Sequence, residues 1–231
     1  ATSNALLGKR TIPASMVAGF KRGMGAELAK ADQAGDEVEL GAILVADEAL
    51  DLPVEGGVHL AENFVGAHLA NYDSMLVLSH FKGHAMGGFG GALKNMSIGV
   101  ASAHGKGCIH CSGATMEKLE DMFEADHDSF LESMADADKA VMDYLGRENI
   151  VYVNVANRLS VDCDCDANPA EPEMGDLGIF ASLDPVALDQ ACVDAVYASE
   201  DEGKAALIER MESRNGIHTV EAAAAHGLGS R

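Results

Sequence analysis

The sequence contains no tryptophan and is short of positive charge. Its 16 lysine and arginine residues face 37 aspartate and glutamate residues, which gives a formal net charge of -21. Such an excess of negative charge repels a phosphodiester backbone, so we expect no nucleic-acid partner. The absence of tryptophan excludes no class of chemistry, and the composition is that of an ordinary acidic bacterial enzyme.

Long apolar runs are also missing from the sequence. No run approaches the roughly 20 residues that a transmembrane helix requires, and no basic, then apolar, leader opens the chain. Five cysteines, an odd number with two close pairs, suit a reducing compartment better than a disulfide framework. We therefore expect a soluble cytoplasmic protein that has no membrane partner.

Segments typical of strands and helices alternate along the chain. Pro13 and the apolar spacing after it predict a helix that ends near Gly35, and residues 38–46 read as a strand. Further strands are predicted in the apolar runs after Asp73, at residues 149–156 and at residues 177–182. The second and third of these runs stand on either side of the long acidic segment that contains the sequence DCDC.

Helices are predicted in the second half of the chain by apolar residues at helical spacing. One helix should run from residue 127 to a stop at Gly146, with an apolar face that includes Phe130, Leu131, Met134, Ala137, Val141 and Tyr144. Another should begin at Pro185 with Asp184 as its N-cap, and two more should end near Gly216 and Gly227. This alternation predicts an α/β layered sandwich, with a largely parallel or mixed sheet flanked by helices. We expect a single α/β domain over residues 1–231, from which an N-terminal part could be missing.

The stretch SHFKGHAMGGFGGALKN, residues 79–95, follows one of the predicted strands directly. It lacks the hydroxyl after the lysine that a Walker loop requires, and no acidic residue stands where the dinucleotide fingerprint needs one. Its glycines still let the backbone approach a ligand closely, while its lysines and histidines offer charge and proton transfer. The alternative is a tight turn with solvated lysines. The candidate catalytic residues are His84 and Lys94, and the candidate residues for substrate or cofactor binding are Lys82, Gly87, Gly88, Gly90, Gly91, Asn95 and Arg214.

Two short cysteine motifs suggest a metal. GCIHC places Cys108, His110 and Cys111 together, and DCDC adds Cys163 and Cys165. Thiolate and imidazole ligands suit zinc, nickel or iron, so the candidate metal ligands are His80, His110, Cys108, Cys111, Cys163 and Cys165. The alternative is that these cysteines are reduced surface or core residues. We expect Cys192, on an apolar helical stripe, to belong to the core.

The longest motifs resemble a known family. LSHFKGHAMGGFGGALKNMSIGVAS, NRLSVDCDCDANPAEPEMGDLGIFASLDPVALDQACVD and ESRNGIHT together resemble the family called domain of unknown function 362 (DUF362), whose members are often described as uncharacterised iron-sulfur centre proteins. The resemblance covers most of the chain from about Val38 onward. In many relatives a ferredoxin-like insert follows the turn that is here SAHGKG, residues 102–107, and this chain has no such cysteine run.

A second, local resemblance is to the nickel-pincer lactate racemase family. The spacing of His84, Lys94 and His110 is similar to that of the histidine, lysine and later histidine of that family. The resemblance implies that Lys94 anchors an organic nickel cofactor, that His110 ligates the metal and that His84 moves a proton. The second acid/base histidine of a racemase would come from His59, His68 or His80.

The combined expectation is an enzyme, a metal-dependent oxidoreductase or isomerase, that binds a transition metal (an iron-sulfur cluster, nickel or zinc) and acts on a small anionic molecule. A first alternative is an iron-sulfur electron-transfer or binding module without turnover. A second is a racemase or isomerase with a lysine-linked nickel cofactor. The sequence leaves the oligomeric state open, with a homodimer as one option.

Overall fold

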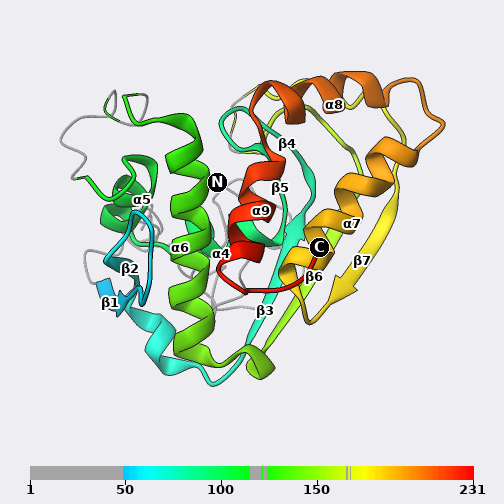
Figure 1. The fold of residues 1–231 in the computed structure, drawn as a ribbon. Helices are drawn as coiled ribbons and strands as arrows, with labels where there is room; N and C mark the ends of the chain where they lie inside the picture. The colour runs from blue at the N-terminus through cyan, green and yellow to red at the C-terminus, as the bar shows by residue number, and fades with distance from the viewer. Residues whose placement is uncertain (1–48, 115–120, 122–123, 165, 167) are drawn as a thin grey trace, which may run out of the picture.

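The computed structural model describes residues 49–114, 121, 124–164, 166 and 168–231. The helix predicted from Pro13 and the strand predicted at residues 38–46 lie outside these residues, as does the candidate ligand Cys165. The described chain contains β-strands, α-helices and two short 3₁₀ turns (Figure 1). Strands and helices alternate, which confirms the predicted α/β fold.

A three-stranded mixed sheet forms the centre of the fold. It consists of β3 (Met75–His80), β6 (Ile150–Ala156) and β7 (Gly178–Ser182), in the order β3-β6-β7. The first pair is parallel and the second is antiparallel. All three strands were predicted from their apolar runs, and the prediction of a mixed sheet is confirmed.

Helices cover one face of this sheet in two layers. Helix α4 (Ala92–Val100) packs on β3, and α7 (Pro185–Ala198) packs on β6 and β7. Helix α6 (His127–Leu145) contacts α4, and it lies beside α9 (Ile217–Ala225), as Figure 1 shows. Alternate residues of the strands are therefore buried beneath these helices, among them Val77 and Tyr152.

The remaining elements lie around this core. Strands β1 (Ala49–Pro53) and β2 (Glu62–Gly66) form an antiparallel hairpin, which packs against α6 and α5 (Ala103–His110). Helix α8 (Lys204–Ser213) contacts α7 and a second small hairpin, β4 (Lys82–His84) with β5 (Gly88–Gly90). The 3₁₀ turns span Ala67–Asn71 and Arg147–Asn149. Neither hairpin was predicted from the sequence.

The predicted helix boundaries agree closely with the structure. Helix α6 ends at Gly146, which has the positive φ of 82° that glycine adopts without strain, and Asp184 caps α7 by accepting a hydrogen bond from the Ala187 N–H (2.8 Å). The prediction for Tyr144 was wrong. The residue is 44% exposed, at the last turn of α6.

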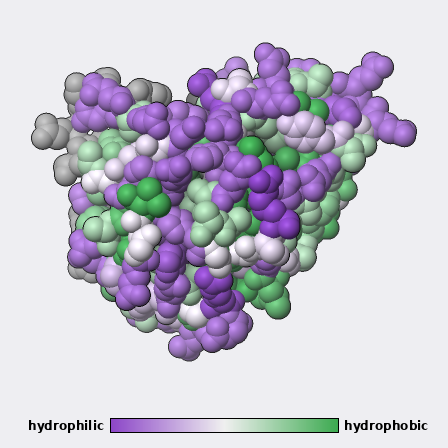
Figure 2. Space-filling model, viewed as in Figure 1, coloured by the Kyte–Doolittle hydropathy of each residue, from purple (hydrophilic) through white to green (hydrophobic). Residues whose placement is uncertain are grey.

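The face of the molecule that carries α6, α7, α8 and α9 is mainly hydrophilic in the view of Figure 2. Hydrophobic residues appear there between the hydrophilic ones. This pattern agrees with the large excess of acidic residues in the sequence. Among the residues that the structure describes, no helix is both long and apolar enough to cross a bilayer.

Candidate functional site

The glycine-rich stretch folds as a hairpin that leads into a helix. Strand β3 ends at His80, and the chain turns at once into β4, then β5, and then α4. The hairpin pairs Lys82 with Gly90 and His84 with Gly88. Because α4 starts two residues after β5, this topology brings Lys82, His84 and Lys94 to the carboxyl end of β3, the edge at which α/β proteins bind their ligands.

The N-terminus of α4 is already occupied by a side chain of the protein itself. The fully buried carboxylate of Asp189, on α7, accepts hydrogen bonds from the backbone N–H groups of Ala92 (2.7 Å) and Leu93 (3.0 Å). It also accepts one from Asn154 Nδ2 (2.7 Å). A phosphate bound at a helix N-terminus uses the same N–H groups, so this turn is not a phosphate cradle.

Two of the glycines are explained by packing rather than by a ligand. A Cβ on Gly91 would lie 2.3 Å from Asp189 Oδ1, so glycine lets the carboxylate reach the helix. Gly88 has a φ of 76°, and a Cβ there would lie 2.8 Å from the Cα of Gly216. This contact explains why the motifs GGFGG and RNGIHT both contain glycine. Gly90 is different, because a Cβ there would make only ordinary contacts, 3.6 Å from the Nζ of Lys82 and 3.8 Å from the Cδ of Lys94.

Three lysines gather at this edge of the sheet. Lys82 is only 2% exposed, and its Nζ donates a hydrogen bond to the His80 carbonyl (3.2 Å). Burial lowers the pKa of Lys106, which lies on α5. The charge of Lys94, on α4, lowers it further, so the two lysines are neighbours. Lys82 also pairs with the Asp164 carboxylate (3.5 Å), which offsets part of the positive charge at this edge of the sheet.

His84 stands inside this lysine cluster and is held by the backbone. Its Nδ1 accepts hydrogen bonds from the N–H groups of Gly87 (2.9 Å) and Met86 (3.2 Å). Backbone N–H groups can only donate, so Nδ1 carries no proton and the neutral ring has its proton on Nε2. Burial lowers the pKa of His84, a hydrogen bond with Cys163 opposes this, and the charges of Lys94 and Lys82 lower it further. His84 is therefore a neutral hydrogen-bond donor.

His110 has the opposite tautomer. Its Nδ1 lies 2.7 Å from the backbone carbonyl oxygen of Lys106, which can only accept, so Nδ1 carries the proton and Nε2 carries the lone pair of the neutral ring. The ring stacks on Phe130, with centroids 5.0 Å apart. Burial lowers the pKa of His110, the bond to Lys106 opposes this, and the charges of Lys94 and Lys106 lower it further. His110 is therefore a neutral base beside two lysines.

His80 and Cys163 lie at the same edge of the sheet. Both ring nitrogens of His80 face oxygen acceptors, the carboxylate of Asp164 (2.9 Å) and the carbonyl of Asn157 (2.6 Å), so neither offers a lone pair to a metal in this arrangement. Burial would raise the pKa of Asp164, but the bond from His80 and the charge of Lys82 outweigh this and lower it. Cys163 is buried and is hydrogen-bonded to His84.

Other predicted site residues lie apart from the lysines or have structural contacts. Arg214 is exposed at the end of α8, where its carbonyl oxygen accepts a hydrogen bond from His127 Nε2 (2.8 Å). The buried Asn95 donates from Nδ2 to Ser79 Oγ (3.0 Å) and to the carbonyl of Leu78, which ties α4 to β3. Cys192 is fully buried in the core, as predicted.

The donor set for a metal is incomplete in the described part of the chain. There, no group of three or more histidine, cysteine or acidic residues is arranged to hold a metal ion. Burial raises the pKa values of Cys108 and Cys111, and neighbouring charges raise them further, which disfavours the thiolate that a metal requires. These residues alone do not fit a cluster, and with Cys165 outside the described residues the metal prediction stays a prediction.

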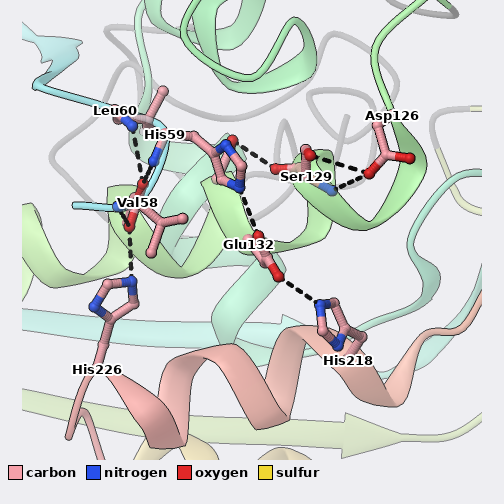
Figure 3. A network of polar contacts seen from close by, with 10 residues as sticks. Val58, His59, Leu60, Asp126, Ser129, Glu132, His218 and His226 are labelled. Atoms are coloured by element: carbon pink, nitrogen blue, oxygen red, sulfur yellow. Dashed lines mark hydrogen bonds and ion pairs between the residues drawn. The ribbon is translucent and has the colours of Figure 1, made fainter.

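A second polar network joins α6 to the loop after β1 and to α9 (Figure 3). Glu132 bridges two histidines, His59 (2.5 Å) and His218 (2.9 Å), from the loop after β1 and from α9. One helical turn further on, the buried carboxylate of Asp136 accepts hydrogen bonds from the backbone N–H groups of residues 58–60 and from His226 Nε2 (2.7 Å). In this network His59, a candidate acid/base histidine, is paired with Glu132.

The sequence analysis missed two residues of the site. Lys106 stands in the turn SAHGKG, and Asp189 in LDPVALDQAC. A lysine between two glycines carries no helical pattern of its own, and an aspartate inside a predicted helix reads as a solvated residue. Only the packing of α5 and α7 against α4 shows that both contribute to this edge of the sheet.

Comparisons with known proteins give one result. Comparison with curated proteins and with solved structures gave no match. The family model described as "Domain of unknown function (DUF362)" matches residues 19–194, which include the glycine-rich hairpin, the three lysines and Asp189. Because this match spans well over half of the sequence, the chain belongs to the DUF362 family.

Proposed function

We propose that this protein binds a small anionic molecule at Lys82, Lys94 and Lys106 and moves a proton on it. The observation that carries the proposal is the pair of histidines fixed in opposite tautomers around Lys94. His110 presents a lone pair on Nε2, whereas the Nε2 proton of His84 is engaged by its hydrogen bond with Cys163. A neutral base beside ammonium groups that can hold an anion supports proton abstraction next to a carboxylate.

The positive charge of the lysines supports both binding and chemistry. An ammonium group beside a carboxylate stabilises the negative charge that develops when a C–H bond loses its proton. Burial lowers the pKa values of both histidines, and the charges of these ammonium groups lower them further, which keeps both rings unprotonated near neutral pH. We propose a cytoplasmic protein, because the described cysteines 108, 111, 163 and 192 form no disulfide.

The test follows solvent deuterium into small acids. The full chain is incubated in D₂O with pyruvate, lactate and related 2-oxo and 2-hydroxy acids, and loss of the C–H signal is followed by proton NMR. His110→Gln should slow exchange by about 100-fold or more, the usual contribution of a general base. His84→Gln should also slow it, whereas His68→Gln, at an exposed histidine that contacts Asn71, should not. Exchange that survives in both site variants would refute the proposal.

Anion binding is tested separately from turnover. Inorganic phosphate should raise the thermal midpoint of the wild-type chain, and Lys94→Met should abolish this effect because it removes the ammonium group between the two histidines. Lys139→Met, at a lysine paired with Asp143 on the exposed side of α6, is the matched control. A phosphate effect that is equal in both variants would contradict the lysine site. Metal analysis of the purified chain tests the predicted iron, nickel or zinc in the same preparation.

A further inference from the structure

We propose that Asn215 and Gly216 are positioning residues for His84, because they hold the turn of the β4–β5 hairpin that fixes the orientation of its ring. The inference rests on the proposed function, since His84 belongs to the proposed site. It goes further by giving a role to the motif RNGIHT, residues 214–219, which takes no part in the proposed anion binding or proton transfer.

Helix α6 anchors this segment through side-chain contacts near the N-terminal end of the helix. In order along the segment, the Arg214 carbonyl oxygen lies 2.8 Å from His127 Nε2, Asn215 Nδ2 donates to Asp128 Oδ1 (2.9 Å), and His218 Nε2 lies 2.9 Å from Glu132 Oε1. The three α6 residues stand within the first two turns of the helix, so contacts to one rigid element fix the place of the segment.

Asn215 also sets the path of the backbone after α8. Its φ is 47°, in the left-handed region that asparagine adopts more readily than most residues. The next N–H, that of Gly216, donates to the carbonyl of Met211 (2.8 Å), which closes the end of the helix. The chain therefore leaves α8 along a defined path that brings Gly216 to the hairpin.

Gly216 lies against the turn of the hairpin, with little room for a side chain. A Cβ on Gly216 would lie 3.0 Å from the Gly87 carbonyl oxygen and 3.2 Å from the Cα of Gly88. A Cβ on Gly88 would in turn lie 2.8 Å from the Cα of Gly216. Glycine at both positions lets the two backbones touch, so the segment supports the turn directly.

The same turn holds the ring of His84. The N–H of Gly87 donates to His84 Nδ1 (2.9 Å), and the N–H of Met86 donates to the same atom (3.2 Å). The ring is also hydrogen-bonded to Cys163. Because Gly87 meets Gly216 through its carbonyl and His84 through its N–H, a displacement of the segment reaches the ring through a single residue.

Gly216→Ala tests the contact with the turn. The added Cβ must displace the Gly87 carbonyl by a few tenths of an ångström, so the N–H of Gly87 should lose its alignment with His84 Nδ1. Proton–nitrogen NMR spectra of the full chain, labelled at histidine and glycine, report which ring nitrogen carries the proton, and His84→Gln identifies the His84 signals. In Gly216→Ala the Nε2–H tautomer should give way to a mixture of tautomers. The Gly87 N–H should exchange with D₂O about 10-fold faster, because its acceptor is lost.

Gly57→Ala is the matched control for a tight glycine. A Cβ on Gly57 would lie 2.2 Å from the Leu60 carbonyl oxygen, in the loop after β1. This variant should be less stable in urea unfolding and should leave the His84 signals unchanged. A merely structural effect of a crowded glycine is thereby separated from an effect on the ring.

Asn215→Ala tests the anchor without adding bulk. It removes the contact with Asp128 at an exposed residue, so the chain should fold, and the His84 signals should shift in the same direction as in Gly216→Ala. Its control is Asn149→Ala, which removes a side-chain donor to the Leu145 carbonyl (2.8 Å) and should leave the His84 signals unchanged.

The outcomes separate the two proposals. His84 signals that stay as in the wild type in both Gly216→Ala and Asn215→Ala would overturn the positioning role, as would an equal change in Gly57→Ala. If Gly216→Ala does not fold, Asn215→Ala alone decides. In the D₂O assay with small acids, Gly216→Ala should exchange the C–H about 10-fold more slowly at saturating acid and should still be stabilised by phosphate. A wild-type chain that exchanges no C–H would refute the proposed function, and a changed His84 tautomer in the variants would then still support the positioning role.

Discussion

Removing the carboxylate of Asp189 should destabilise the whole fold and not only the site. In Asp189→Ala, the N–H groups of Ala92 and Leu93 and the Nδ2 of Asn154 lose their acceptor. Each buried donor without an acceptor costs about 1–3 kcal/mol, so the three together cost about 6 kcal/mol. The new alanine cannot replace any of these hydrogen bonds.

Part of this loss of stability is offset, because the variant no longer buries the charged carboxylate that the wild-type chain buries at neutral pH. Burial raises the pKa of Asp189 to about 6, against the pull of its three donors. A shift of about two pH units corresponds to about 3 kcal/mol, which the variant recovers at pH 7. The expected net loss is therefore about 3 kcal/mol, which lowers Tm by about 6–12 °C in a domain of this size.

Urea unfolding followed by circular dichroism at pH 7 measures this loss. Asp184→Ala is the matched control, since Asp184 also caps a helix but is only half-buried, and it should cost about 1 kcal/mol. The Asp189 variant should in addition lose the phosphate effect, because α4 carries Lys94. A variant at Asp189 that is no less stable than the one at Asp184 would refute the assignment of this carboxylate as the anchor of α4.

Two more predictions concern packing and pH. Gly91→Ala places a Cβ against the Asp189 carboxylate and should cost about 1–3 kcal/mol in urea unfolding, whereas Gly66→Ala, where the nearest atom is 3.8 Å away, should change little. Burial alone would lower the pKa of His218, but the bond to Glu132 and nearby acidic charges raise it. Its stabilising effect is thus complete below pH 6.5 and fades as the pH rises through the raised pKa. His218→Asn should therefore be more destabilising at pH 5.5 than at pH 8.5, and equal losses at both values would contradict this reasoning.

The central layers of the fold could be predicted from the sequence. The run at residues 75–80 begins with four apolar residues, and the run at residues 150–156 is rich in β-branched residues, so both favour strands. Gly146 and Pro185 mark helix ends by their backbone preferences. The two hairpins could not be predicted in this way. The strands β4 and β5 have only three residues each, and glycine dominates them, so their pairing depends on tertiary contacts and not on local preference.

The candidate site was predictable only in part. His84 and Lys94 are near in sequence and lie at the end of a recognisable strand, so their shared location followed from the topology. The tautomers of His84 and His110 could not be predicted, because each depends on the one backbone group that its Nδ1 meets. The role of Asp189 could not be predicted either, since 97 residues separate it from Ala92.

The carboxylate of Asp136 has a consequence for the order of folding. It accepts hydrogen bonds from the backbone N–H groups of residues 58–60, which lie 76 to 78 residues away in the sequence. It also pairs with His226 near the C-terminus. Contacts between such distant segments require long loops to close, so they form late and slow the folding of a chain that depends on them. Once closed, they hold the first hairpin and the last helix to the middle of the same helix. The two ends of the described chain should therefore open together, so a protease that frees one end would expose the other as well.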